Sequence, residues 1–329
     1  MKKSFTSAIL LIFISVSAFA QSSGSKQESF TPNGKPIVTV YTDFTNTTSN
    51  GKSNNAFELQ RAYLGYGYNF SPEFSGKVVF DIANTAGLNP SAFTSFLKNA
   101  YAEYSQGMVK ADMGMIGTSM FGLQESIWGK RYLYKSFQDQ YGFGSSADLG
   151  AKVTLQFIPQ VSLDLAVFNG EGYKKVQVDS VVQAAVGVTV QPVKNVYARV
   201  YYDYMKKSVA QSSFNAMAAY KSDKGTIAVE YNLQNGHGMI ANRNFSGISV
   251  YGTVLFAKQF TAFARFDDLM SEKIGTATTG WNSTDGQVYM VGVEYFPVKG
   301  IQISPNVRYS NLTVGNSITS INLNVGLSL

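Results

Sequence analysis

The side chains of this chain that could do chemistry are charged groups rather than nucleophiles. The sequence has no cysteine and a single histidine, His237, in a stretch rich in Gly and Asn. Thiolate chemistry and disulfides are therefore excluded, and no base stands beside a nucleophile. We expect His237 to be a solvated loop residue. Spacing typical of metal ligands is absent, and Gly129-Lys130 lacks the setting of a phosphate loop. The sequence predicts no catalytic residue, metal or cofactor.

Charged side chains recur at alternate positions of short segments and also gather in one long segment. The alternating positions are Arg61, Lys77, Asp81, Lys110, Asp112, Lys152, Arg199, Asp203, Arg265, Asp267 and Arg308. The long segment, residues 118–146, carries Glu125, Lys130, Arg131, Lys135 and Asp139. Charged groups in a polar passage lower the barrier for hydrated solutes. The alternative is that these side chains only pair across strands, as at Arg265 with Asp267 or Arg199 with Asp203.

The first twenty residues have the pattern of a signal peptide. Lys2 and Lys3 precede an apolar run at 8–20, which ends in an A-x-A cleavage signal before Gln21. The run is too short to be a spanning helix. We predict a signal peptide at 1–20, a flexible periplasmic leader at 21–34 and a single domain at 35–329.

The composition is unusual for a soluble protein. Aromatic residues make up 14% of the chain, with 20 Tyr and 23 Phe. Charged residues make up 15%, against roughly 25% in a typical globular domain. Removing Lys2 and Lys3 lowers the basic count from 27 to 25, against 21 acidic residues. This near balance does not favour strong ion selectivity, and the lack of a basic block argues against a nucleic-acid partner.

From Lys35 onward, alternation of period two indicates β-strands. We count sixteen candidate strands; in the second, Ala62, Leu64 and Tyr66 share one face and Arg61 and Tyr63 the other. Tight turns near 71, 106, 159, 193, 223, 258 and 298 alternate with longer polar connections near 46–55, 84–95, 118–146, 170–180, 205–212, 235–245, 270–286 and 310–317. Seven short turns and eight longer loops fit sixteen strands.

Alternation alone does not separate a soluble sandwich from a membrane barrel, since a sandwich would bury the apolar face in its core. The signal peptide, the rhythm of the turns and the apolar C-terminal strand favour a bacterial outer-membrane barrel. Backbone groups in lipid must be paired, so the sheet must close. The predicted fold is all-β: a transmembrane antiparallel β-barrel of sixteen strands. Its apolar faces would meet outer-membrane lipid, and its charged faces would line an aqueous lumen.

Several stretches resemble bacterial porins, specifically the porin O and P (phosphate-selective porin-like) family of Bacteroidota. They include 57–82 (FELQRAYLGYGYNFSPEFSGKVVFDI), 97–104 (LKNAYAEY), 111–125 (ADMGMIGTSMFGLQE), 260–269 and 293–310. The resemblance implies a sixteen-stranded channel, usually a homotrimer, with its third loop folded inward. Phosphate selectivity is a weaker implication, because the basic ladder of the best-known members has no residue-by-residue match. The chain also departs from the pattern by ending in Leu329 rather than Phe or Trp.

The strand count makes 118–146 the third outer loop, between strands five and six. Its length and the resemblance favour insertion into the lumen, and the alternative is a lid outside the barrel. We expect a helical turn or two at Ser126–Tyr134. Lys130, Arg131 and Lys135 are candidates for a basic constriction opposed by Glu125 and Asp139, which suggests a mild preference for anions.

The leading interpretation is an outer-membrane porin for passive diffusion of small hydrophilic or anionic solutes. A second is a structural or adhesive outer-membrane barrel that acts through its surface loops. A third, the least favoured, is an outer-membrane enzyme.

Overall fold

The computed structural model describes residues 30–85 and 89–329, so the predicted signal peptide and most of the predicted leader lie outside the described residues. Residues Asn33–Leu329 form one compact unit. The strands found in the described residues are β1 (Asn33–Ser49), β2 (Lys52–Asn69), β3 (Phe74–Thr85), β4 (Asn89–Gln106), β5 (Val109–Gly117), β6 (Ala147–Ile158), β7 (Val161–Phe168), β8 (Gln183–Val190), β9 (Val196–Lys206), β10 (Ala210–Ser222), β11 (Gly225–Asn235), β12 (Phe245–Ala257), β13 (Phe260–Ser271), β14 (Gly286–Tyr295), β15 (Ile301–Leu312) and β16 (Ile318–Ser328).

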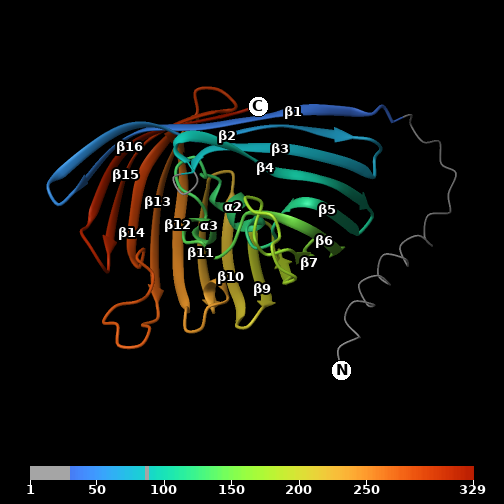
Figure 1. The fold of residues 1–329 in the computed structure, drawn as a ribbon. Helices are drawn as coiled ribbons and strands as arrows, with labels where there is room; N and C mark the ends of the chain where they lie inside the picture. Colours follow the sequence, from blue (N-terminus) through green and yellow to red (C-terminus); the bar gives the residue numbers. More distant parts are fainter. Residues whose placement is uncertain (1–29, 86–88) are drawn as a thin grey trace. The chain divides into compact units, whose positions relative to one another are not determined.

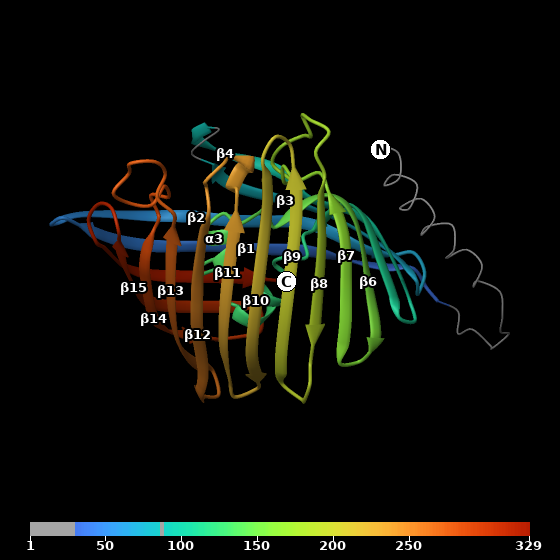
Figure 2. The ribbon, with the colours of Figure 1, turned by 90° about the horizontal axis from the view of Figure 1, so that it is seen from below.

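These strands form a closed barrel in which each strand pairs with its neighbours in sequence (Figure 1). The last strand closes the ring by pairing antiparallel with the first, from Thr39 opposite Ser328 to Ser49 opposite Ile318. Strands β6 to β13 lie side by side as one continuous wall (Figure 2). The predicted sixteen-stranded antiparallel barrel is confirmed, and closure leaves no unpaired strand edge.

The two faces of the barrel wall differ in the way the alternation predicts. Apolar side chains such as Phe57, Ile227 and Val291 are exposed on the outer face. Polar side chains such as Asn232 and Asp267 are buried on the inner face. None of the helices in the described residues is long and apolar enough to span a membrane.

The connections are less regular than the sequence suggested. Strands β1 and β2 continue through the polar stretch 46–55 and meet at Asn50 and Gly51, whose φ angles are 49° and 71°. Positive φ at both positions is the type I′ geometry that Asn-Gly favours. Strands also occupy much of 84–95 and of 205–212. The prediction of eight longer loops was therefore wrong, because these polar residues belong to strands longer than the 9–11 residues that a bilayer requires.

Two β-bulges interrupt the alternation near the middle of the first strands. The register between β1 and β2 shifts after Tyr41 and leaves Gln60 without a strand partner. The register between β3 and β4 shifts after Val79 and leaves Lys98 without one. A bulge residue breaks the period of two and redirects its side chain. Both bulges place a polar side chain on the inner face of the wall.

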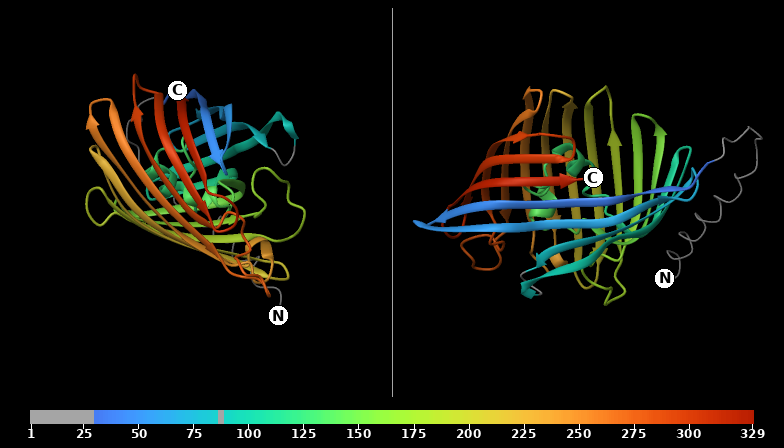
Figure 3. Two further views of the ribbon diagram at one scale, coloured as in Figure 1. Left: turned by 90° about the vertical axis from the view of Figure 1, so that its left-hand side faces the viewer. Right: turned by 90° about the horizontal axis from the view of Figure 1, so that it is seen from above.

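Residues 118–146 connect β5 to β6 and lie within the ring of strands (Figure 3). They contain the short helices α2 (Gly122–Trp128) and α3 (Phe137–Gln140). The expected helical turn or two at Ser126–Tyr134 is confirmed in part. Helix α2 covers 126–128 and ends where Gly129 adopts the left-handed conformation with φ 64°, and a further turn follows in which Tyr134 N donates to Lys130 O at 3.2 Å. We call 118–146 the lumen loop.

The lumen loop packs against apolar side chains on the inner face of β9 to β14. One cluster joins loop residues to wall residues; it includes Ile127, Trp128, Tyr132, Met217, Tyr251, Phe263 and Met290. A second includes Phe137, Tyr141, Phe143, Tyr201, Phe245 and Leu269. Burying aromatic rings of this size favours the docked loop by up to about 1.5–3 kcal/mol each.

Candidate functional site

Wall side chains hold the lumen loop by its backbone carbonyl groups. Successive carbonyl oxygens from 132 to 135 accept hydrogen bonds from Asn324 Nδ2 (3.3 Å), Arg308 Nη2 (3.1 Å), Trp128 Nε1 (2.8 Å) and Arg265 Nη1 (2.8 Å). The guanidinium of Arg265 also lies 4.9 Å from the ring centroid of Trp128 and 5.2 Å from that of Tyr134. Trp128 belongs to the loop itself. The other three donors come from β16, β15 and β13, so together they fix the position of the segment in the lumen.

The five charged loop residues named from the sequence have different environments. Lys130 is buried and pairs with Glu294 of β14, whose other carboxylate oxygen accepts a hydrogen bond from Tyr132 Oη at 2.7 Å. Arg131 pairs with Glu125 and, at 2.6 Å, with Asp139. Lys135 forms no ion pair with any residue that the structure describes. Of the three basic candidates, Lys135 is therefore the one whose charge is not offset by a direct partner.

Most of the charged wall positions form ion pairs. The pairs are Arg61 with Asp81, Lys110 with Glu103 (2.7 Å), Lys152 with Asp112 (3.1 Å), Arg199 with Asp164, and Arg265 with Asp267 (2.8 Å). The pairing of Arg265 with Asp267 agrees with the sequence. That of Arg199 with Asp203 was wrong, because Asp203 instead accepts a hydrogen bond from Tyr201 Oη at 3.0 Å. Lys77 lines a separate lumen cavity of about 350 Å³ with Lys35.

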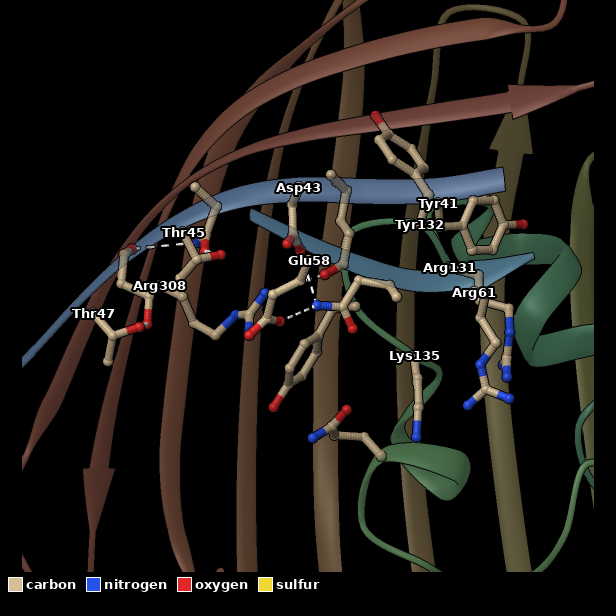
Figure 4. Close-up of a pocket in the computed structure, with 16 residues that line it drawn as sticks. Tyr41, Asp43, Thr45, Thr47, Glu58, Arg61, Arg131, Tyr132, Lys135 and Arg308 are labelled. Atoms are coloured by element: carbon tan, nitrogen blue, oxygen red, sulfur yellow. Dashed lines mark hydrogen bonds between the residues drawn. The ribbon is translucent and has the colours of Figure 1, made fainter. Parts of the chain in front are cut away.

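A cavity of about 420 Å³ separates the lumen loop from β1, β2, β15 and β16 (Figure 4). Its lining residues are Tyr41, Asp43, Thr45, Thr47, Glu58, Gln60, Arg61, Arg131, Tyr132, Leu133, Tyr134, Lys135, Gln140, Arg308, Ser320 and Asn322. We call it the constriction cavity. In Figure 4, Arg61 and Arg131 lie at one end, Thr45 and Thr47 at the other, and Asp43 and Glu58 between them.

The charges at the constriction cavity favour anions. Four basic side chains line it, Arg61, Arg131, Lys135 and Arg308, and of these Lys135 and Arg308 form no ion pair with a described residue. Two lining carboxylates, Asp43 and Glu58, also form none. The lining as a whole therefore has four basic side chains against two carboxylates.

Lys98 and Lys174 do not line the cavity, but each contacts a tyrosine that also contacts one of the lining arginines. Lys98 Nζ donates to Tyr63 Oη at 3.2 Å, and Arg131 Nε approaches the same oxygen at 3.4 Å. Lys174 Nζ lies 5.7 Å from the ring centroid of Tyr173, whose hydroxyl is 3.2 Å from Arg61 Nη1. The basic groups thus form one connected neighbourhood at the arginine end of the cavity.

Sequence reasoning missed Glu58, Gln60 and Lys98. Strict alternation from Arg61 and Tyr63 places Glu58 and Gln60 on the lipid face, yet Gln60 Nε2 donates to Asp43 (3.1 Å) and to Glu58 (2.7 Å) inside the lumen. The bulges cause the error, because one extra residue reverses which positions face inward. The available signal was the presence of polar residues on a face that is otherwise apolar.

His237 lies in the connection between β11 and β12, as predicted, but it is half-buried rather than fully solvated. It lies in the 3-10 helix η2 (His237–Met239), and its Nδ1 is 2.5 Å from Gln234 Oε1. Its ring stacks on Trp281 at 5.3 Å and meets Phe245 edge-on at 5.2 Å. Burial, and secondarily the charge of Arg243, lower the pKa of His237 below its ordinary value of 6.5. These neighbours include no nucleophile that His237 could activate.

Acid is expected to loosen the loop at 236–244. A histidine whose folded pKa is lowered binds protons more readily when the loop opens. Its stabilising contribution is therefore complete above about pH 6.5 and is lost as the pH falls through the folded pKa. Hydrogen exchange in 236–244 should accelerate between about pH 7 and pH 5, after correction for intrinsic rates, and His237→Phe should reduce that acceleration. An equal response in both proteins would show that His237 does not hold the loop.

No protein-family model and no curated protein sequence matches this chain. Solved structures do match, and they belong to the class of bacterial outer-membrane porins and channels. The resemblance to the porin O and P family therefore stays a prediction.

Three of these structures show the extent of the likeness. The outer membrane channel DcaP of Acinetobacter baumannii is 14% identical with a TM-score of 0.67, over 94% of this chain and 100% of that one. Salmonella typhi OmpF is 10% identical with a TM-score of 0.69, over 89% and 97%. The anion-selective porin from Comamonas acidovorans is 9% identical with a TM-score of 0.64, over 91% and 100%. At these identities the likeness establishes the fold alone.

Proposed function

We propose that this chain is an outer-membrane porin that lets small hydrophilic solutes diffuse passively, with a mild preference for anions. The observation that carries the proposal is the constriction cavity, whose lining holds four basic side chains and two carboxylates. A polar lumen inside a closed barrel suits hydrated solutes. The matches to an outer membrane channel and to a porin named as anion-selective support the same function.

The remaining parts of the proposal come from the sequence. Residues 1–20 would direct export as a signal peptide, and 21–34 would form a periplasmic leader before the barrel. The apolar outer face would contact outer-membrane lipid. The family resemblance supports a homotrimer, and a membership in the porin O and P family. We propose no enzymatic role.

Reconstitution in planar bilayers tests the proposal. Folded protein, verified by a change of gel migration on boiling, should give stepwise increases in conductance. Folded protein that inserts without conductance would refute a diffusion channel and would favour a barrel that acts through its surface.

One feature favours that second candidate, a structural or adhesive barrel. The connection between β7 and β8 exposes Val176 and Val178 by 80% and 83%. Exposed apolar side chains in a loop are suited to contact another surface. Replacing both valines with Ser should abolish cell-surface adhesion under this alternative and leave it unchanged if the protein is only a channel.

A further inference from the structure

We propose that the constriction cavity is a binding subsite for a hydroxylated organic anion of about monosaccharide size, such as a sugar acid or a sugar phosphate. This inference rests on the proposed function and names the solute class of the same lumen. It follows from the juxtaposition of a cationic end with a wall of hydroxyl, amide and carboxylate groups.

The size of the cavity suits a small organic solute better than an inorganic ion. Its volume is about 420 Å³, whereas one water molecule occupies about 30 Å³ of liquid. Pockets for small organic ligands range from about 300 to 1,000 Å³. A bare chloride or phosphate would leave most of the cavity filled by water, while a sugar ring with one charged substituent would contact several walls at once.

The charged end of the ligand would lie against Lys135. This ammonium has no ion-pair partner among the described residues, and Arg61 and Arg131 flank the same end of the cavity (Figure 4). Both guanidinium groups already bind carboxylates, so Lys135 has the charge that remains free for a solute. Charge-assisted hydrogen bonds from these groups suit a carboxylate or a phosphate equally.

The other end of the cavity offers hydrogen-bonding groups to hydroxyls. Thr45 Oγ1 donates to Asn322 Oδ1 at 2.9 Å, and Thr47 Oγ1 lies 3.3 Å from Ser320 Oγ. Glu58 is an exposed carboxylate on the same lining, and it can accept a hydrogen bond from a hydroxyl group. A carboxylate accepts hydrogen bonds but repels a second anionic group. Arg308 also lies at this end (Figure 4), where Asp43 and Glu58 offset its charge. The two carboxylates against one guanidinium therefore favour a hydroxylated body over a second negative charge.

The bulge at Gln60 is the feature that builds this wall. Gln60 Nε2 bridges Asp43 and Glu58, at 3.1 Å and 2.7 Å, and so holds two carboxylates side by side. A regular strand would turn Gln60 toward lipid. Tyr41 and Tyr132, with ring centroids 6.3 Å apart, line the cavity beside this network. Aromatic rings next to hydroxyl-binding groups can pack against the apolar C–H faces of a sugar ring.

Blockade of the ion current by solutes tests the inference. We expect D-glucuronate and glucose 6-phosphate to half-block the current at concentrations about tenfold below those of D-glucose and hexanoate. D-glucose has the hydroxyl groups without the negative charge, and hexanoate has the charge without the hydroxyl groups. A tenfold difference corresponds to about 1.4 kcal/mol. The ratio between glucuronate and glucose 6-phosphate then identifies the preferred head group. Equal blockade by hexanoate and glucuronate would overturn the inference, and so would tighter blockade by zwitterionic 6-aminohexanoate.

Two variants separate the two ends of the site. Gln60→Leu should raise the half-blocking concentration of glucuronate about fivefold, the loss of about one hydrogen bond, without changing that of hexanoate. Lys135→Gln should weaken both. Lys258→Gln, which removes an exposed charge at the turn between β12 and β13, should change neither. Identical glucuronate blockade in Gln60→Leu and the unaltered protein would contradict the proposed wall.

Failure of this inference can be told apart from failure of the proposed function. An anion-preferring channel that does not discriminate glucuronate from hexanoate overturns only the subsite. If folded protein shows no conductance, calorimetric titration of the detergent-solubilised barrel with glucuronate, glucose and hexanoate decides the subsite by itself. Heat of binding for glucuronate alone would support it, and no difference among the three would overturn it.

Discussion

Replacing Lys135 with Glu is expected to convert the mild anion preference of the channel into a cation preference. Lys135 lines the constriction cavity and has no ion-pair partner in the described part of the chain. The substitution removes a positive charge and adds a negative one. Each unit charge about 4 Å from a passing ion changes its energy by about 1 kcal/mol in water, which is roughly fivefold in relative permeability. The reversal potential in a salt gradient measures this ratio.

Lys258→Glu is the matched control for charge. It makes the same change at an exposed turn residue away from the constriction cavity. The reversal potential should change sign in Lys135→Glu and stay near the unaltered value in Lys258→Glu. If both substitutions shift it equally, the net charge of the barrel sets selectivity and the cavity does not. Removing both members of the buried pair, in Lys130→Gln with Glu294→Gln, should have little effect on selectivity, because the pair carries no net charge.

Replacing Arg265 with Leu is expected to release part of the lumen loop and to destabilise the barrel. Arg265 is 4% exposed, pairs with Asp267 and donates to the carbonyl oxygen of Lys135. Removing one member of a buried ion pair costs about 3–5 kcal/mol, since the other charge stays buried. We expect a lower midpoint of thermal unfolding in detergent, together with larger and noisier single-channel currents.

A double variant separates stability from loop anchoring. Arg265→Leu with Asp267→Leu removes both buried charges, so much of the lost stability should return. The hydrogen bond to Lys135 and the contact with Trp128 remain absent, so the noisy current should persist. Quiet currents of normal size in the double variant would show that the other wall donors suffice to fix the loop.

The barrel could be predicted because the signal for each strand lies within the sequence of that strand. Alternation along each strand records which side chains face lipid and which face the lumen. The lumen loop also has its predicted limits, since 118–146 is the segment in which alternation stops. The length of the hairpin at Asn50-Gly51 was missed because polar residues were treated as loop, although Asn-Gly signals a tight turn.

The site was harder to predict because it depends on contacts between distant segments. Nothing near Lys130 in sequence indicates Glu294 as its partner, so the charge of Lys130 seemed available. Bulges at Gln60 and Lys98 reverse the alternation on which the prediction relied. Inward-facing apolar residues such as Phe263 and Leu269 were a usable signal, because a water-filled lumen gives them no partner unless a loop packs there.

The most direct test of the proposed function is the zero-current potential of single channels in a potassium chloride gradient. Four basic side chains line the constriction cavity against two carboxylates, which predicts a modest potential whose sign shows that chloride is the more permeable ion. The preference should weaken as the salt concentration rises, because counterions screen the lumen charges. A zero-current potential whose sign shows that potassium is the more permeable ion, measured on folded, conducting protein, would contradict the account.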